Sequence, residues 1–261
     1  MIEIKKLKTV EEFKQTFEIQ KNAWGISDLE IDPHFLMSRV QKYGGLLQGL
    51  FIDTKCVGFT YGILGKWQGE IFFFSYMAAV MREYQGQGFG FLLKKAQREE
   101  VLKMDYNIIR WNFDPLESLN AYFNFHRLGV ISSEYERNIY GVGDRGLDKG
   151  LPTDRLLVTW NLTSERVIKK MEKKEAKIIE MIPTAKIGEF KNKIAYIEIP
   201  RDIRSLKKND LNQAYEWRAK TCEQFEFAFR SGFVAEEIVF SEDQKRIFYK
   251  LTKKDDDVES D

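Results

Sequence analysis

Three glycines at alternate positions in the segment "EYQGQGFGFLLKK" (83–95) form the spacing that most clearly predicts chemistry. Gly86, Gly88 and Gly90 follow an apolar run that ends at Val80, and they precede a helical pattern. Without Cβ atoms, glycines let several backbone N–H groups converge on one ligand. The start of a helix adds unpaired first-turn N–H groups and the positive end of the helix dipole. The segment therefore predicts an anion site, with phosphate as the usual guest.

Two common phosphate-binding fingerprints do not fit this segment. The dinucleotide pattern G-x-G-x-x-G would need glycine at position 91, where the chain has Phe91. The only acidic residue at the end of the next strand, Asp114, stands before a proline. The nucleotide triphosphate loop needs Gly-Lys-Ser/Thr, which does not follow. The run from Gln85 to Gly90 does fit the pattern [RQ]-x-x-G-x-[GA].

That run resembles the pyrophosphate loop of the GNAT superfamily of acyl-CoA N-acyltransferases, and the order of predicted elements resembles the family over residues 1–162. The resemblance implies acetyl-CoA or another acyl-CoA as co-substrate, with no metal. It places the diphosphate on the backbone of the loop. The cofactor-binding residues that it implies are Ala79, Val80, Gln85, Gly86, Gln87, Gly88, Phe89, Gly90, Ser118 and Asn120.

The strand before the loop is expected to hold the pantetheine arm. Its amides would bind strand backbone, and the N–H of Val80 or of Ala79 would polarise the thioester carbonyl as in an oxyanion hole. The attacking amine must be neutral, so a base or a water chain has to remove its proton. Glu70 is a candidate base acting through water, although a carboxylate at a strand start is also typical of a solvated surface.

A later helix resembles the family pattern N-x-x-A-x-x-x-Y-x-x-x-G-F. Ser118 occupies the usual asparagine position, and Asn120 is displaced towards the alanine. In the family, the tyrosine of this pattern often protonates the departing thiolate, but the chain has Phe125 there. Tyr122, one turn earlier, is the predicted substitute, with the alternative that it packs in the core. His126 is a further catalytic candidate, with a surface or supporting role as the alternative.

The overall composition narrows the class of protein. The chain has 41 Lys plus Arg against 40 Asp plus Glu, a balance that argues against a nucleic-acid-binding surface. Its two cysteines, Cys56 and Cys222, stand far apart and predict no disulfide framework. The N-terminal residues lack an apolar signal core, and no apolar run is long enough to cross a bilayer. A cytoplasmic location without membrane attachment is therefore expected.

The pattern of elements predicts a mixed α/β (α+β) fold. A mostly antiparallel, GNAT-like sheet flanked by helices is expected, with parallel neighbours around the helix that follows the glycines. We predict an acyl-CoA-binding domain at 1–162 and a smaller C-terminal α/β extension at 163–261, with disordered last residues. The extension carries Tyr215, Trp217, Phe225, Phe227 and Phe229, too much apolar material for a solvated tail, and is expected to shape the acceptor pocket.

These observations predict an N-acyltransferase that moves an acyl group from acyl-CoA to the amine of a small molecule or amino acid by direct attack. Acetyl is the expected group and succinyl the alternative. Two other functions stay open: a non-catalytic acyl-CoA-binding sensor or scaffold, and a protein N-acetyltransferase. A homodimer is also left open, since strands that flank such a cleft can be completed by a second subunit.

Overall fold

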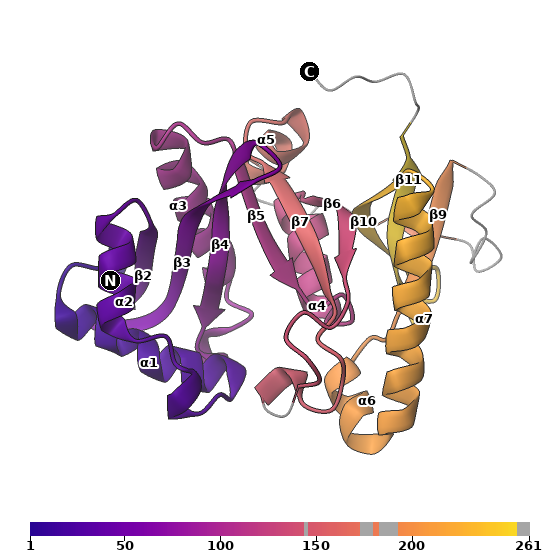
Figure 1. Cartoon of the computed structure of the whole chain (residues 1–261), viewed down its shortest axis with the longest axis horizontal. Coiled ribbons are helices and arrows are strands. Elements are labelled where there is room, and N and C mark those ends of the chain that lie inside the picture. Colours follow the sequence, from indigo (N-terminus) through magenta and orange to yellow (C-terminus); the bar gives the residue numbers. More distant parts are fainter. Residues whose placement is uncertain (144–145, 173–179, 183–192, 255–261) are drawn as a thin grey trace. The chain divides into compact units, whose positions relative to one another are not determined.

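The computed structural model describes residues 1–143, 146–172, 180–182 and 193–254. The chain folds into two compact units (Figure 1). Unit 1 comprises Met1–Trp111 and two short later segments, one of which is Asn161–Thr163. Unit 2 comprises the other described residues from Asn112 onwards. These units divide the chain at a different place from the domains expected from the sequence, and the predicted functional boundary at residue 162 stays a prediction.

Unit 1 is built on a sheet with the strand order β1-β2-β3-β4-β5. The strands are β1 (Ile2–Lys6), β2 (Leu46–Ile52), β3 (Lys55–Trp67), β4 (Glu70–Val80) and β5 (Ile108–Phe113), which continues into unit 2. The helices are α1 (Val10–Trp24), α2 (His34–Lys42) and α3 (Phe89–Lys103), with short 3-10 turns η1 (Asp28–Glu30) and η2 (Arg82–Tyr84). The first four strands pair antiparallel, and β4 pairs parallel with β5 as predicted.

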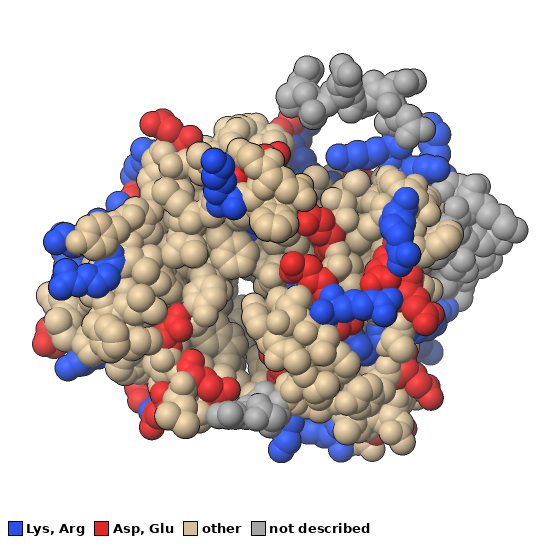
Figure 2. All heavy atoms as spheres, in the orientation of Figure 1, with Lys and Arg blue, Asp and Glu red and all other residues tan. Residues whose placement is uncertain are grey.

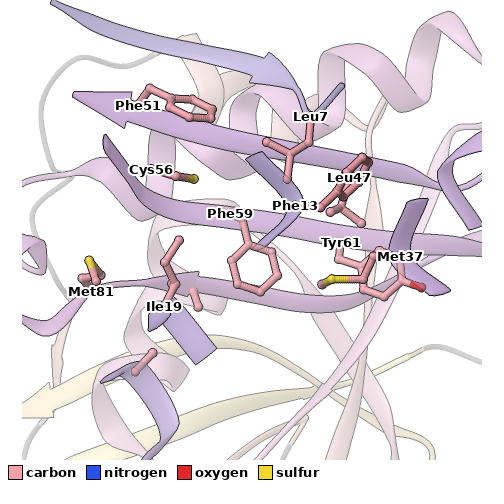
Figure 3. Close-up of a cluster of buried hydrophobic side chains, with 12 residues drawn as sticks. Leu7, Phe13, Ile19, Met37, Leu47, Phe51, Cys56, Phe59, Tyr61 and Met81 are labelled. Atoms are coloured by element: carbon pink, nitrogen blue, oxygen red, sulfur yellow. The ribbon is translucent and has the colours of Figure 1, made fainter. Parts of the chain in front are cut away.

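The two faces of this sheet carry separate hydrophobic clusters. Helix α1 begins at a capping box of Thr9 and Glu12 and supplies apolar residues to the cluster in Figure 3. Ala79 of β4 belongs to this cluster, whereas the next residue, Val80, belongs to a second cluster with Phe89 of α3. Side chains alternate along a strand, so α1 and α3 cover opposite faces of β4.

Unit 2 contains a second set of strands in the order β7-β6-β10-β11-β9, with β8 beside β10. The strands are β6 (Ile131–Glu136), β7 (Arg155–Asn161), β8 (Met181–Ile182), β9 (Ile194–Ile199), β10 (Phe233–Ser241) and β11 (Ile247–Lys253). The helices are α4 (Ser118–Ala121), the π-helical η3 (Tyr122–Leu128), α5 (Glu165–Glu172), α6 (Ile203–Asn209) and α7 (Leu211–Arg230). The short 3-10 turn η4 (Gly146–Asp148) begins in a short segment of unit 1 and ends in unit 2. Among the described strands of this unit, β10 pairs antiparallel with β11 and β6, β11 with β9, and β6 with β7, whereas β8 pairs parallel with β10.

The predicted fold class is confirmed: the sheets are mixed and mostly antiparallel, and helices flank them. The C-terminal strands and long helix also form where the sequence predicted them. Two of the aromatic residues expected to be buried there, Tyr215 and Phe227, are instead exposed on α7. The last residues, predicted to be disordered, include 255–261, which lie outside the described part of the chain.

Charged side chains of both signs are interspersed on the face that Figure 2 shows. This agrees with the near-equal numbers of basic and acidic residues in the sequence. Among the described residues, no helix combines the length and the apolar character needed to cross a membrane.

The C-terminal segment shares the core of unit 2 with residues before position 162. Phe125 is fully buried, and its ring meets the ring of Tyr249 edge-on at a centroid distance of 5.4 Å. Phe225 of α7 is also fully buried and contacts both Tyr249 and Tyr135. Of the predicted aromatic residues, Phe225 therefore packs against the half of the chain that the resemblance assigns to the acyltransferase.

We expect a chain truncated after Thr163 to aggregate rather than fold. The truncation would uncover Phe125 and Tyr135, and the loss of even one large buried aromatic ring costs about 3 to 5 kcal/mol. Size-exclusion chromatography with near-UV circular dichroism checks the result. A monodisperse truncated chain with native near-UV signal would contradict the shared core.

Candidate functional site

The glycine loop that joins β4 to α3 presents open backbone. Gly86 and Gly88 have φ values of +76° and +83°, a region that side chains rarely adopt. A Cβ atom built on either residue meets no atom within 4 Å. The glycines are therefore required by the backbone conformation, and the space next to them is free for a ligand.

The two glutamines of the loop fold back onto the chain that precedes it. Gln85 Nε2 donates to the carbonyl oxygen of Val80 at 2.8 Å, and Gln87 Nε2 donates to the carbonyl oxygen of Glu83 at 3.2 Å. These bonds tie the loop to the end of β4 and to η2. The side chains thus stabilise the loop, and its backbone carries the ligand-binding capacity.

Helix α3 begins without a side-chain cap. Its N-cap residue is Gly88, which has no side chain to accept from the first-turn N–H groups, and the first turn holds no acidic residue. Helix α1 contrasts with it, because Thr9 caps α1 and Glu11 and Glu12 stand in its first turn. The positive end of the α3 dipole is therefore not compensated by a neighbouring carboxylate of its own first turn, which favours a bound anion.

The register of β4 decides which N–H groups face away from β3. Met81 N–H donates to the carbonyl oxygen of Val57 at 2.9 Å, and the pairing with β3 is uninterrupted there. Hydrogen bonding alternates along an antiparallel pair, so the N–H of Ala79 points to β3 and that of Val80 to the other edge. The Val80 carbonyl lies on this other edge as well, where it accepts from Gln85. Of the two donors that the sequence analysis offered, Val80 has the orientation that an oxyanion would need.

A β-bulge in β4 lies where the pairing of β4 with β5 ends. One residue of β3, Gly62, faces Ser75 and Tyr76 of β4, and the described pairs between β4 and β5 end at Phe74 and Arg110. A bulge bends its strand and stops local pairing. Among the described residues of unit 1, β4 from the bulge to Val80 thus has an edge without a strand partner.

A buried lysine lies where the two strands separate. Lys94 of α3 is only 3% exposed, and its Nζ donates to Ser75 Oγ at 3.0 Å and to Gln97 Oε1 at 2.8 Å. The same Nζ lies 3.8 Å from the ring centroid of Trp111. Burial lowers the pKa of Lys94 from its usual 10.5 to about 7. The amine is therefore divided between its charged and neutral forms near neutral pH.

Lys94 is not among the site residues predicted from the sequence. Helix α3 buries Phe89 and Leu93, but Leu92 is 40% exposed and Lys94 is buried. One signal was present: Lys94, Gln97 and Val101 lie on one stripe at helical spacing. The apolar Val101 at the end of that stripe indicates that it faces the core.

Glu70 lies at the opposite end of β4 from the loop. It is nine residues before Ala79, a separation of roughly 30 Å along a strand. Its carboxylate forms an ion pair with Arg110 at 2.8 Å, and the side chain is 59% exposed. The role of Glu70 as general base stays a prediction, and this geometry favours the solvated-surface alternative.

The other predicted site residues belong to unit 2. Ser118 is the first residue of α4, is buried, and its Oγ donates to the carbonyl oxygen of Arg201 at 2.5 Å. Asn120 is exposed. The hydroxyl proton of Ser118 is thus engaged within unit 2, and the Asn120 amide is accessible. Their contacts with pantetheine stay predictions.

Tyr122 and His126 form a stacked pair in η3. Their ring centroids are 4.8 Å apart with an interplanar angle of 21°. His126 is buried, and its Nδ1 lies 3.2 Å from Oε1 of Glu237, while Lys170 donates to Oε2 of the same carboxylate at 2.8 Å. Burial opposes ionisation of Glu237, but the bond from His126 and the charge of Lys170 outweigh it and lower its pKa to about 2. His126 therefore belongs to a structural network, which favours the supporting alternative.

The position of the family's tyrosine lies in the core of unit 2. Phe125 is fully buried, and its ring contacts those of Phe113 and Tyr249. This side chain is a hydrocarbon ring and can donate no proton. Tyr122, which is partly buried, remains the predicted substitute.

The described residues include no cluster of three or more His, Cys, Asp or Glu side chains that could hold a metal ion.

No protein-family model and no curated protein matches the sequence. Similar solved structures include the ribosomal-protein-S18-alanine N-acetyltransferase from Escherichia coli, with 19% identity and a TM-score of 0.48 over 63% of this chain and 96% of that one. The aminoglycoside 6'-acetyltransferase type Ii has 13% identity and a TM-score of 0.49, over 62% and 98% of the two chains.

A third similar structure is a GNAT family acetyltransferase from Elizabethkingia anophelis with acetyl-CoA bound. It has 17% identity and a TM-score of 0.44, over 61% of this chain and 97% of that one. The three similar structures are acetyltransferases, and one of them is a member of the GNAT family. The glycine loop of this chain resembles the pyrophosphate loop of that family.

Proposed function

We propose that this protein is an acyl-CoA-dependent N-acyltransferase that moves an acyl group to the amine of a small molecule or amino acid. One observation carries the proposal: the open edge of β4 at Val80 runs directly into a glycine loop and an uncapped helix start. A strand edge suits the amides of a pantetheine arm, and the loop suits a diphosphate. Acyl-CoA carries both groups in this order.

The loop fits the diphosphate in charge and in shape. Gly86 and Gly88 leave open space beside the backbone, and the side chains of Gln85 and Gln87 turn away towards the preceding chain. Backbone N–H groups and the α3 dipole then supply the positive field. This supports binding of the donor.

The transfer step itself depends mainly on the positioning of the two reactants. A backbone N–H on the open edge of β4 would polarise the thioester carbonyl, and a neutral amine held against it attacks directly, which converts a two-body reaction into one within a complex. Acetyl is the expected acyl group, with succinyl as the alternative. The acceptor pocket is proposed to involve residues 163–261.

The test measures release of free thiol from acetyl-CoA, succinyl-CoA and longer donors across a panel of amines, amino acids and peptides. Amine-dependent release supports the proposal. Tight binding of CoA without release from any donor would instead favour the acyl-CoA sensor or scaffold. The buried Phe125, at the position of the tyrosine in the resembled family, is an observation in favour of this alternative. A response confined to peptides would favour a protein N-acetyltransferase.

We expect Tyr122→Phe to lower kcat more than it changes the affinity for acyl-CoA. A hydroxyl used only in the transition state affects the chemical step and not ground-state binding. The ring, which stacks on His126, is kept by this change. Steady-state kinetics with a parallel CoA titration checks it, and an unaltered kcat would remove Tyr122 from the mechanism.

A further inference from the structure

The length of the pantetheine arm places the thioester near the β-bulge. From the diphosphate oxygen to the sulfur the arm has about twelve bonds, which equals about four residues of extended chain at three backbone bonds per residue. An arm that begins beside Val80 and follows the open edge of β4 therefore ends beside Tyr76 and Ser75. These are the two residues of the bulge.

Among the described residues, Lys94 is the buried ionisable group that contacts Ser75. The described pairs of β4 and β5 end at Phe74 and Arg110, and the next residue on each strand, Ser75 and Trp111, contacts Lys94 Nζ. The amine therefore lies between the two strands where they part, on the α3 side. Gln97 Oε1 accepts from both Lys94 Nζ and Ser75 Oγ and so holds the amine beside the Ser75 hydroxyl.

We propose that Lys94 is the catalytic acid and base of the acyl transfer, which makes this inference rest on the proposed function. The amine nitrogen of the acceptor bonds to the thioester carbon, and the carbon–sulfur bond breaks with its electron pair going to sulfur. The Lys94 ammonium gives its proton to that sulfur. Neutral Lys94 then receives the proton that the attacking nitrogen loses, through Ser75 Oγ or water, and the products are an amide and free CoA thiol.

The chemistry of the Lys94 side chain suits this role. A proton-transfer group works best when its pKa lies near the operating pH, and burial lowers the pKa of Lys94 to about 7. The position that holds a tyrosine in the resembled family is Phe125, which can carry no proton. Lys94 would supply this proton donor as the alternative to Tyr122, and comparison of kcat in Tyr122→Phe and in Lys94→Met distinguishes the two.

The charged neighbours on the packed elements have partners of their own. Arg98, one turn along α3, donates to the carbonyl oxygen of Leu162 at 2.6 Å. Arg110 of β5 pairs with Glu70, the charged residue at the start of β4. Lys95 is exposed and follows Lys94 directly, which makes it a matched control. A pH profile that changes in Lys94 variants and not in Lys95 variants therefore reports Lys94.

The first experiment compares wild type, Lys94→Met, Lys94→Arg and Lys95→Met by kcat, KM and CoA affinity from pH 6 to 9. We expect both Lys94 variants to lose about 100-fold or more in kcat with CoA affinity kept, and to lose the pH dependence near neutrality. Lys95→Met should behave as wild type. A Lys94→Met kcat within about threefold of wild type, with the same pH profile, would overturn the inference.

The second experiment needs no acceptor. It follows ionisation of the thiol of bound CoA by thiolate absorbance, in wild type and in Lys94→Met, with desulfo-CoA as the blank. In wild type a neutral Lys94 accepts the thiol proton, so thiolate should form at a pH about one unit lower than in the variant. Equal ionisation in both proteins overturns the role of Lys94.

The two experiments separate the inference from the proposed function. A wild type that binds CoA but releases no thiol with any amine refutes the proposed transfer, and the CoA thiol titration still decides whether Lys94 exchanges a proton with sulfur. A wild type that transfers acyl groups while Lys94→Met does so equally well refutes the inference alone. Failure to bind CoA refutes both.

Discussion

Gly88→Glu is expected to weaken CoA binding by at least about 100-fold, a loss of about 3 kcal/mol. The new carboxylate would stand at the start of α3, where the diphosphate is proposed to sit. Two like charges about 4 Å apart repel by about 1 to 4 kcal/mol, depending on their exposure to solvent. The added side chain also fills space that is open at this glycine. Isothermal titration of CoA into the folded variant measures the loss.

The control variant Gly69→Glu distinguishes the effect of a new charge at the site from the effect of backbone strain. Gly69 lies in the turn between β3 and β4, has a φ of +86°, and also has no atom within 4 Å of an added Cβ. Both substitutions should therefore lower the free energy of unfolding by about 1 to 2 kcal/mol. Only Gly88→Glu should lose CoA. Equal CoA affinity in the two folded variants would remove the diphosphate from this loop.

Lys94→Met is expected to raise the free energy of unfolding by up to about 4 kcal/mol at pH 7, because burial of this lysine opposes its charged form. The folded-state pKa of Lys94 is lowered to about 7 from 10.5. Between these two values the unfolded chain binds the proton that the folded chain lacks, so the cost of burying the lysine falls as pH rises. The gain in Lys94→Met should thus be largest at and below pH 7 and should shrink towards pH 10.

Urea unfolding of wild type, Lys94→Met and Lys95→Met at pH 7 and pH 9.5 measures this gain. The exposed Lys95 should give no more than about 0.5 kcal/mol in either direction at both values. If Lys94→Met were no more stable than wild type at pH 7, burial of Lys94 would not lower the stability of the folded protein. A variant that is more stable and less active would show that the fold retains Lys94 for function.

The sequence predicted much of unit 1 because its signals are local. The glycines, the apolar run of β4 and the helical spacing of α3 each depend on neighbouring residues, and the structure contains all three elements. The β-bulge at Ser75 and Tyr76 has no such signal, since it depends on how β3 and β4 align. The open strand edge that follows from it could therefore not be predicted.

Lys94 and Phe125 show two further limits. A lysine in a helix usually lies in solvent, and only the packing of α3 on Ser75 and Trp111 buries this one. Phe125 stands where the resembled pattern has a tyrosine, but its burial depends on Tyr249, which is more than a hundred residues away in the sequence. Both cases require long-range contacts that spacing along the chain does not contain.

The most direct test of the proposed acyl transfer is the release of free thiol from acetyl-CoA by the wild-type protein with a mixed panel of amines, followed with a thiol reagent. The protein's own thiols should contribute little, because Cys56 and Cys222 are buried, and burial raises the pKa of Cys56 to about 12. We expect release that requires both the protein and an amine and that is lost in Gly88→Glu. Release that Gly88→Glu retains in full, or no release from acetyl-CoA or succinyl-CoA with any amine, would contradict the proposed transfer.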